Sequence, residues 1–219
     1  MTTYLVTGAS RGIGYELCRQ LKDNGENVIA VCRSTSEQLD GLGVQVEADT
    51  HITSDESVAN LAHRLKGTPI NVLINNAGVY KKSTLDDLDF DGIRQQFEVN
   101  SLGALRITHA LIPNLSPGSK VAIITSRMGS IADNTSGSSY GYRMSKVALS
   151  MAGKSLSLDL KPQQIAVAIL HPGLVSTDMT NYSGISTEES VQGLLDRINQ
   201  LNLDSSGTFW HANGEVLPW

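Results

Sequence analysis

Short apolar runs alternate with longer amphipathic stretches from one end of this chain to the other. The runs predict strands at residues 4–7, 27–31, 44–47, 70–75, 120–125, 165–170 and 208–211. Helical spacing predicts helices at residues 12–24, 54–66, 90–115, 141–160 and 187–201. Strands that alternate with helices imply right-handed crossovers and a parallel sheet covered on both faces. We therefore expect an α/β fold, a doubly wound (Rossmann) parallel sheet of about seven strands in a single domain spanning residues 1–219.

Composition argues against several other classes of protein. The chain has 219 residues and a formal net charge of -5, which is not the basic footprint of a nucleic-acid-binding domain. No apolar run approaches the roughly 20 residues that cross a bilayer, and the first residues do not resemble a secretory signal. Cys18 and Cys32 are too few for a disulfide framework, so we expect two packed thiols. We expect a cytoplasmic protein with no nucleic-acid or membrane partner and, because its histidines lack ligand spacing, no metal.

A glycine-rich turn directly follows the first predicted strand. Gly8, Gly12 and Gly14 have the spacing G-x-x-x-G-x-G and open the first predicted helix. Glycines let the backbone turn tightly and approach a pyrophosphate, which the free N–H groups of a helix N-terminus then bind. An ordinary strand-to-helix turn is the alternative for three glycines alone. Ligands in such folds bind beyond the carboxyl ends of the strands, so the placement of this turn favours phosphate binding.

The end of the second predicted strand indicates which dinucleotide is bound. A carboxylate there would accept a hydrogen bond from the ribose 2′-OH of NAD, but no acidic residue occurs between Glu26 and Glu37. Arg33 would instead bind the 2′-phosphate of NADP through its planar guanidinium, and Arg11 in the glycine turn is a second nearby cation. We therefore expect NADP(H) to be favoured over NAD(H).

Tyr142 and Lys146 lie four residues apart on a predicted helix and therefore share one face. A phenol of pKa near ~10 is a weak acid for catalysis at neutral pH, and a neighbouring ammonium is expected to lower that pKa. Such a pair alone also occurs by chance on many helices. Ser126 ends a predicted strand and is a candidate donor to a substrate carbonyl. Asn100 interrupts a long predicted helix, either as a local kink or as an exposed polar position.

In this order, these residues and the glycine turn resemble the short-chain dehydrogenase/reductase family over essentially the whole chain. The resemblance implies an NADP-dependent oxidoreductase that reduces aldehydes, ketones or quinones to alcohols. Three features resemble its C-factor and sniffer-type carbonyl reductases: a short segment at residues 178–186, Ser-Arg-Met-Gly-Ser at 126–130, and the ending Leu-Pro-Trp. The C-factor resemblance leaves open a dinucleotide-binding signalling or regulatory protein in which turnover is secondary.

The resemblance also implies roles for individual residues. Tyr142 would exchange the proton with the substrate, Ser126 would bond the substrate oxygen, Lys146 would bond the cofactor ribose, and Asn100 would hold a water of a proton relay. The implied cofactor contacts are Gly8, Ser10, Arg11, Gly12, Ile13, Gly14, Arg33, Asp49, Asn76, Ala77, Gly78, Tyr142, Lys146, Pro172, Gly173, Val175 and Thr177.

The identity of the carbonyl-contacting serine is left open between two residues. Ser126 precedes Tyr142 by more residues than is usual in the family, so Ser130 is an alternative carbonyl-contacting serine; the extra residues are expected at 133–139.

The predicted helix 141–160 has an apolar stripe that contains Met144, Met151 and Leu158. Family members commonly pair through this helix and the one at 90–115, which implies a homodimer or homotetramer. Burial within the protein's own core is the alternative.

Overall fold

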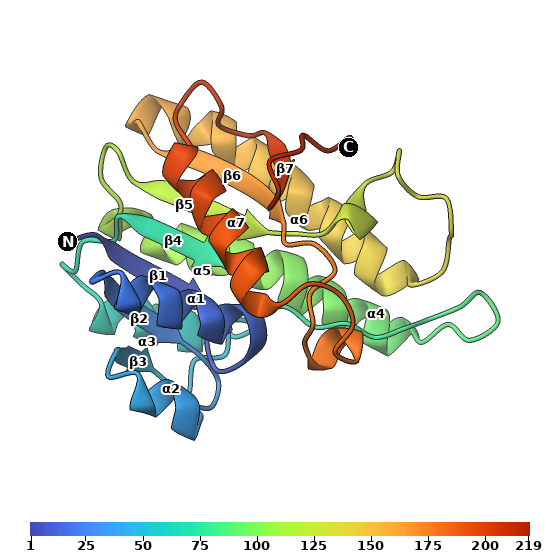
Figure 1. The fold of residues 1–219 in the computed structure, drawn as a ribbon, viewed down its shortest axis with the longest axis horizontal. Coiled ribbons are helices and arrows are strands. Elements are labelled where there is room, and N and C mark those ends of the chain that lie inside the picture. Colours follow the sequence, from blue (N-terminus) through green and yellow to red (C-terminus); the bar gives the residue numbers. More distant parts are fainter.

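Seven parallel strands form one sheet in the computed structural model, which describes residues 1–219 (Figure 1). The strand order is β3-β2-β1-β4-β5-β6-β7, and every neighbouring pair is parallel. The predicted doubly wound class is therefore confirmed. The strands are β1 (Thr3–Thr7), β2 (Asn27–Val31), β3 (Gln45–Glu47), β4 (Val72–Asn75), β5 (Lys120–Ile124), β6 (Ala166–His171) and β7 (Phe209–His211).

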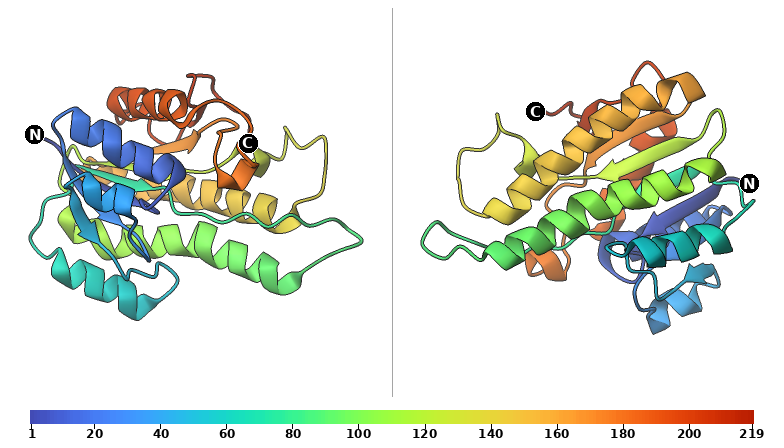
Figure 2. Two further views of the ribbon diagram at one scale, coloured as in Figure 1. Left: turned by 60° about the horizontal axis from the view of Figure 1, so that its bottom comes forward. Right: turned by 180° about the vertical axis from the view of Figure 1, so that it is seen from behind.

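Helices cover both faces of this sheet (Figure 2). Helices α1 and α7 lie on one face, and α3, α4, α5 and α6 lie on the other. None of them is both long and apolar enough to span a membrane. The helices are α1 (Gly12–Asp23), α2 (Glu37–Gly41), α3 (Asp55–Arg64), α4 (Phe90–Phe97), α5 (Gly103–Leu111), α6 (Tyr140–Asp159) and α7 (Thr187–Gln200).

The core is divided by the sheet into two apolar layers. Successive strand side chains point to opposite faces, so Leu5 belongs to the layer under α3, α5 and α6, and Val6 belongs to the layer under α1 and α7. Val121 and Ala122 of β5 are divided in the same way. Because both faces are buried, the strands read as continuous apolar runs instead of alternating ones.

Side-chain caps fix where three helices begin. The Ser54 hydroxyl accepts a hydrogen bond from the backbone N–H of Ser57 at 3.2 Å, at the start of α3. Asp89 caps α4 and Ser186 caps α7 in the same way. Each such cap typically stabilises a helix by about 0.5–2 kcal/mol. The sequence predicted the Ser54 cap, and the structure confirms it.

The helix predicted at residues 90–115 is interrupted. Between α4 and α5 lies a π-helical turn, Glu98–Leu102, and a 3-10 turn containing Pro113 ends the stretch. Asn100 sits in the π turn and is fully buried. Of the two alternatives for Asn100, the local distortion is confirmed and the exposed position is wrong.

The buried face of α6 combines small residues with Tyr142, Lys146 and Leu149, and the predicted apolar stripe lies on the exposed face. Met144, Met151 and Leu158 are 50%, 66% and 62% exposed. A Cβ atom at Gly141 would lie 2.5 Å from Gln96 Nε2 of α4. Glycine therefore lets α6 approach α4 more closely than a larger residue would. Burial of the stripe within the protein's own core, one of the two alternatives, is wrong.

Candidate active site

In the glycine turn, residues 7–14, Gly8 and Gly14 have no room for a Cβ atom where the chain enters α1. Gly8 and Gly12 adopt left-handed φ values of +69° and +54°, which favour glycine. A Cβ atom at Gly14 would lie only 2.1 Å from the carbonyl oxygen of Gly8. The N-cap residue Arg11 provides no side-chain cap, so the positive end of α1 presents backbone donors to a ligand. This arrangement fits a pyrophosphate group.

Hydrogen bonds join the glycine turn to the segment that follows β4. The Thr7 hydroxyl accepts from the backbone N–H groups of Asn76 and Ala77 at 3.0 and 3.1 Å. Asn76 Nδ2 in turn donates to the carbonyl oxygen of Thr7 at 3.0 Å. A Cβ atom at Gly8 would lie 2.8 Å from Ala77 Cα. The two predicted cofactor-binding segments therefore form one continuous surface.

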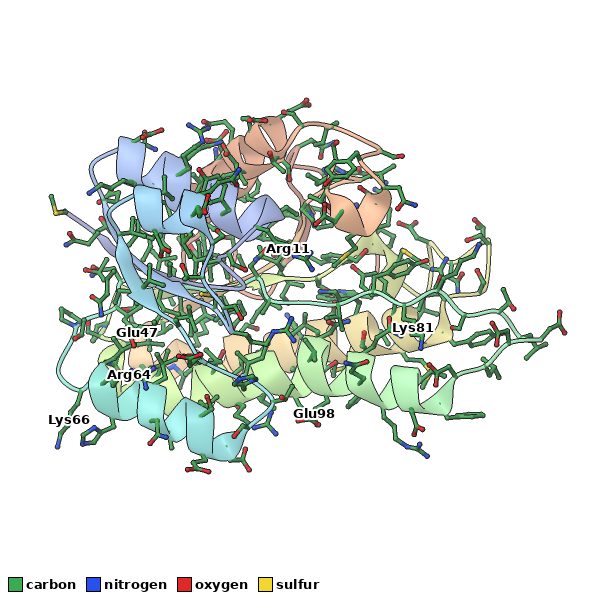
Figure 3. The ribbon with its side chains drawn as sticks, turned by 90° about the horizontal axis from the view of Figure 1, so that it is seen from below. Arg11, Glu47, Arg64, Lys66, Lys81 and Glu98 are labelled. Atoms are coloured by element: carbon green, nitrogen blue, oxygen red, sulfur yellow. The ribbon has the colours of Figure 1, made fainter.

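The two candidate phosphate-binding arginines have different surroundings. Arg33 is exposed directly after β2, and its carbonyl oxygen accepts from the backbone N–H of Asp49 at 3.2 Å. Arg11, labelled in Figure 3, instead forms an ion pair of 2.9 Å with Asp178 in the segment after β6. Arg33 and Asp49 thus lie together where the adenosine end is expected, and Arg11 already pairs with a carboxylate.

The segment after β6 returns to the glycine turn. Pro172 and Gly173 follow the strand, and Val175 is buried and forms a bridge with Ile185. A Cβ atom at Gly12 would lie 3.4 Å from Thr177 Cγ2. Predicted cofactor contacts from distant parts of the chain are therefore neighbours. Ser10 and Ile13 lie in the same turn, and Ser10 is held through its carbonyl oxygen by the Ser36 hydroxyl at 3.0 Å.

Tyr142 and Lys146 of α6 lie beside Ser126, which follows β5. The exposed fractions of Tyr142, Lys146 and Ser126 are 9%, 4% and 7%. Ser126 lies close enough to Tyr142 to act against the rise of its pKa, and its hydroxyl accepts from the backbone N–H of Met128 at 3.1 Å. The Ser130 hydroxyl accepts from the backbone N–H of Asp133 at 3.2 Å, but Ser130 is not among the groups that act on the pKa of Tyr142. The geometry therefore favours Ser126 as the carbonyl-contacting serine.

Burial controls the protonation of this pair. It raises the pKa of Tyr142 to about 12, with Ser126 acting in the opposite direction and Tyr80 adding to the rise. It also lowers the pKa of Lys146 to about 8, because a buried site disfavours charge. The Lys146 Nζ atom is 5.7 Å from the centre of the Tyr142 ring and donates to the carbonyl oxygen of Ile124 at 2.9 Å. Burial sets the direction for Tyr142, and Lys146 is not among the groups that act on its pKa, so the lowering of that pKa by Lys146 stays a prediction.

Asn100 is held by the turn that follows β4. Its Oδ1 accepts from the backbone N–H of Val79 at 2.8 Å. Its Nδ2 donates to the Val79 carbonyl and to the Ser145 hydroxyl, both at 2.9 Å. A Cβ atom at Gly78 would lie 3.3 Å from Asn100 Oδ1 and 3.6 Å from Lys146 Nζ. Asn100 and Lys146 therefore converge on Gly78, and the π turn directs the amide into the site.

Three residues near Tyr142 are not among the site residues that the sequence predicted. The Tyr80 ring stands perpendicular to the Tyr142 ring, with 5.1 Å between centres. Its hydroxyl is 3.1 Å from that of Ser139, and Arg143 donates to carbonyl groups of the same loop. All three contacts involve segments without helical or strand periodicity, so no sequence pattern indicates them.

Comparisons with known proteins agree with this geometry. A family model described as short chain dehydrogenase matches residues 2–187. The 1-hydroxy-2-glutathionyl-2-methyl-3-butene dehydrogenase of Rhodococcus sp. (strain AD45) is 43% identical over 226 residues, covering 100% of both chains. The C-signal protein of Myxococcus xanthus is 46% identical over 155 residues, which cover 69% of this chain and 93% of that protein.

Solved structures resemble the whole chain. The carbonyl reductase Sniffer of D. melanogaster is 27% identical with a TM-score of 0.93, and 100% of both chains are covered. A carbonyl reductase from chicken fatty liver, solved with NADPH bound, is 29% identical with a TM-score of 0.91. That match covers 100% of this chain and 99% of the other.

Proposed function

Because this chain belongs to the short-chain dehydrogenase family, we propose that it is an NADP(H)-dependent oxidoreductase that reduces aldehydes, ketones or quinones to alcohols. The family resemblance inferred from the sequence is confirmed, with C-signal and sniffer-type proteins among its relatives. One observation carries the finer proposal. A buried Tyr142 lies beside Ser126 and shares the carboxyl edge of the sheet with Lys146 and with a glycine turn in which Gly8 and Gly14 have no room for a Cβ atom.

The residues around the glycine turn fit a dinucleotide. Positions where a Cβ atom would collide with backbone leave space for phosphates, and the uncapped start of α1 supplies donors. Arg33 is exposed at the carboxyl end of β2, where its guanidinium would bind a 2′-phosphate, and β2 carries no carboxylate that would bind a 2′-OH. The NADPH-bound chicken carbonyl reductase supports the same choice. Asp49, Asn76, Ala77, Gly78, Pro172, Gly173, Val175 and Thr177 would complete the site.

When bound, NADPH would supply the hydride. Ser126 would donate a hydrogen bond to the substrate oxygen, and Tyr142 would donate the proton that completes the alcohol. A phenol whose pKa is about 12 is protonated at neutral pH. The proton that the reduction consumes is therefore present on Tyr142. Lys146 would bond the ribose, and Asn100 would hold the water that links Lys146 to solvent.

The test is NADPH oxidation followed at 340 nm with a panel of aldehydes, ketones and quinones, compared with NADH. We expect turnover of several carbonyls with NADPH and weaker turnover with NADH. Tyr142→Phe serves as the inactive control because it keeps the ring. NADPH binding without oxidation by any carbonyl in the panel would contradict the proposal.

A second candidate is oxidation of a glutathione-conjugated alcohol. The Rhodococcus relative, whose printed name describes such a dehydrogenase, matches this chain over its full length. Incubation with NAD⁺ or NADP⁺ and 1-hydroxy-2-glutathionyl-2-methyl-3-butene tests this candidate directly. Turnover of that alcohol well above turnover of the carbonyl panel would favour it over carbonyl reduction.

A signalling role is the third candidate, and the C-signal relative favours it. Such a role would need the dinucleotide-binding surface but not the proton donor. The Tyr142→Phe variant separates the two functions in a host strain that lacks the natural gene. Restoration of a mutant phenotype by an inactive protein would support signalling, and restoration by the active protein alone would support catalysis.

We also propose that two or four copies assemble through the exposed apolar face of α4, α5 and α6. Soluble proteins rarely leave such a face uncovered. Analytical ultracentrifugation should detect a dimer or tetramer, and Met151→Glu should weaken it. A wild-type monomer at micromolar concentration would contradict the assembly. The face comprises Phe97, Leu102, Leu105, Met144, Met151 and Leu158, which are 37–66% exposed.

A further inference from the structure

Two segments distant in the sequence meet in front of Tyr142. The segment after β4 carries Tyr80, and the loop before α6 carries Ser139; both project from the carboxyl edge of the sheet (Figures 1 and 2). The Tyr80 and Ser139 hydroxyl groups are 3.1 Å apart. The backbone N–H of Ser139 also donates to the carbonyl oxygen of Ser83 at 2.7 Å. The two segments are therefore joined at two points, one through side chains and one through backbone.

The loop is held in an unfavourable conformation at this junction. Ser138 and Ser139 have φ values of +50° and +51°, a left-handed region that residues other than glycine rarely occupy. Arg143 stabilises it by donating through Nε to the carbonyl oxygens of Gly137 and Ser138 at 3.0 and 3.2 Å. Such backbone strain persists only where the surroundings enforce it and is frequent at functional sites. The position of the Ser139 hydroxyl is thus fixed by the fold.

Tyr80 is fixed in turn against the proposed proton donor. Its ring is perpendicular to that of Tyr142 at 88°, with 5.1 Å between centres. Tyr80 is nevertheless 38% exposed, so part of its ring faces solvent beside Tyr142. A substrate whose oxygen bonds Ser126 and Tyr142 must place its carbon skeleton beside these groups. Apolar Leu174 and Met179, 61% and 44% exposed, follow β6 at the same edge.

We propose that Tyr80, anchored by Ser139, is a specificity-determining residue that selects carbonyls bearing a flat aromatic ring over those bearing a puckered aliphatic one. This inference rests on the proposed carbonyl reduction. A fixed aromatic ring interacts best with another aromatic ring, through stacked or edge-to-face contacts. A puckered ring of the same size offers only nonspecific apolar contact to the same wall. The Ser139 hydrogen bond limits rotation of the Tyr80 ring and keeps the wall in place.

The test compares benzaldehyde with cyclohexanecarboxaldehyde, two aldehydes whose rings have the same number of carbon atoms. The measured quantity is the ratio of their kcat/KM values with NADPH, for each variant relative to wild type. Intrinsic reactivity cancels in this comparison. We expect Tyr80→Ala to lower the preference for benzaldehyde about three- to tenfold. Tyr140→Ala, which truncates a tyrosine exposed at the start of α6, is the matched control and should leave the ratio unchanged.

Two milder variants test the anchor. Tyr80→Phe keeps the ring but loses its hydroxyl, and Ser139→Ala loses the partner. Each should lower the ratio by about two- to threefold, and the double variant should lower it no further, because the two groups act through one hydrogen bond. Circular dichroism checks that each variant folds. If Tyr80→Ala does not fold, Tyr80→Phe and Ser139→Ala still decide the question.

The outcomes separate this inference from the proposed function. Wild type that reduces both aldehydes, with an unchanged ratio in every Tyr80 and Ser139 variant, overturns the role of Tyr80 and leaves carbonyl reduction standing. An equal fall in kcat/KM for both aldehydes also overturns it, because it indicates a structural role. Wild type that reduces no carbonyl at all overturns the proposed function, and the inference with it.

Discussion

The glycine turn and the cluster around Tyr142 lie at the same edge of the sheet, but the first is formed by backbone and the second by side chains. The turn consists of backbone: a Cβ atom at Gly8 or Gly14 would collide with neighbouring main chain. The cluster consists of buried side chains, Asn100, Ser126, Tyr142 and Lys146, held by hydrogen bonds from several elements. The first region is sensitive to added volume. The second is sensitive to the loss of single polar atoms and to protonation.

The largest expected effect comes from removing one atom of the cluster. Tyr142→Phe should lower turnover by about 10²–10⁴-fold, the usual contribution of a general acid–base group. NADPH affinity should change little, because the glycine turn is untouched. Steady-state kinetics and isothermal titration measure the two quantities separately. Wild-type turnover in this variant would show that Tyr142 is not the proton donor.

A charge reversal at the adenosine end of the cofactor region should have the next largest effect. Arg33→Asp removes the partner of a 2′-phosphate and supplies an acceptor for a 2′-OH. Loss of a charge-assisted hydrogen bond costs about 1.5–3 kcal/mol, so NADPH affinity should fall roughly tenfold to hundredfold while NADH affinity rises. Titration of both cofactors measures the change. Equal binding of NADPH and NADH by wild type would already refute the role of Arg33.

Added volume in the glycine turn should affect stability as well as binding. In Gly14→Ala the new Cβ atom would lie 2.1 Å from the Gly8 carbonyl oxygen and 2.6 Å from Asn76 Nδ2. We expect the free energy of unfolding to fall by roughly 1–3 kcal/mol, measured by urea denaturation, with weaker NADPH binding. Gly41→Ala is the control, because its Cβ atom would meet nothing within 4 Å. Similar losses in both variants would refute the crowding argument.

The smallest effect at neutral pH is expected at His171, which ends β6 on the substrate side. Burial, with His211, Arg127 and Lys146 nearby, lowers its pKa from 6.5 to about 3. Between pH 6.5 and 3 the unfolded chain binds a proton here that the folded protein does not. Stability should therefore fall as the pH falls through this window. His171→Leu should flatten the slope of unfolding free energy against pH.

A variant without a titrating group provides the control for His171. Ser54→Ala removes the cap of α3 and should lower stability at every pH by about 1 kcal/mol without altering the slope. Both slopes are obtained from urea denaturation at a series of pH values. A slope in His171→Leu equal to that of wild type would show that this imidazole does not set the acid sensitivity.

The sequence predicted the glycine turn better than it predicted the surroundings of the side chains around Tyr142. The glycine turn and the Ser54 cap depend on local conformation, which residue type restricts directly. The stripe on α6 was predicted, but a subunit interface and the core both stayed open as its surroundings, because periodicity reports an apolar face but not whether that face meets the core or another surface. The pKa of Tyr142 depends on burial by distant segments, and the Tyr80–Ser139 contact joins two irregular loops. Neither leaves a periodic signal in the sequence.

The orientation of Asn100 in the site depends on the number of residues in the π turn at Glu98–Leu102. An α-helix rotates by about 100° per residue, and a π turn accommodates one residue more than a regular turn. Deletion of a single residue there would restore a regular helix and rotate α4 relative to α5 by about that angle, turning Asn100 away from Val79. The exposed loop at 131–137 can change length without such a rotation. Related chains that keep this chemistry should therefore vary in length at the loop and not within the helix.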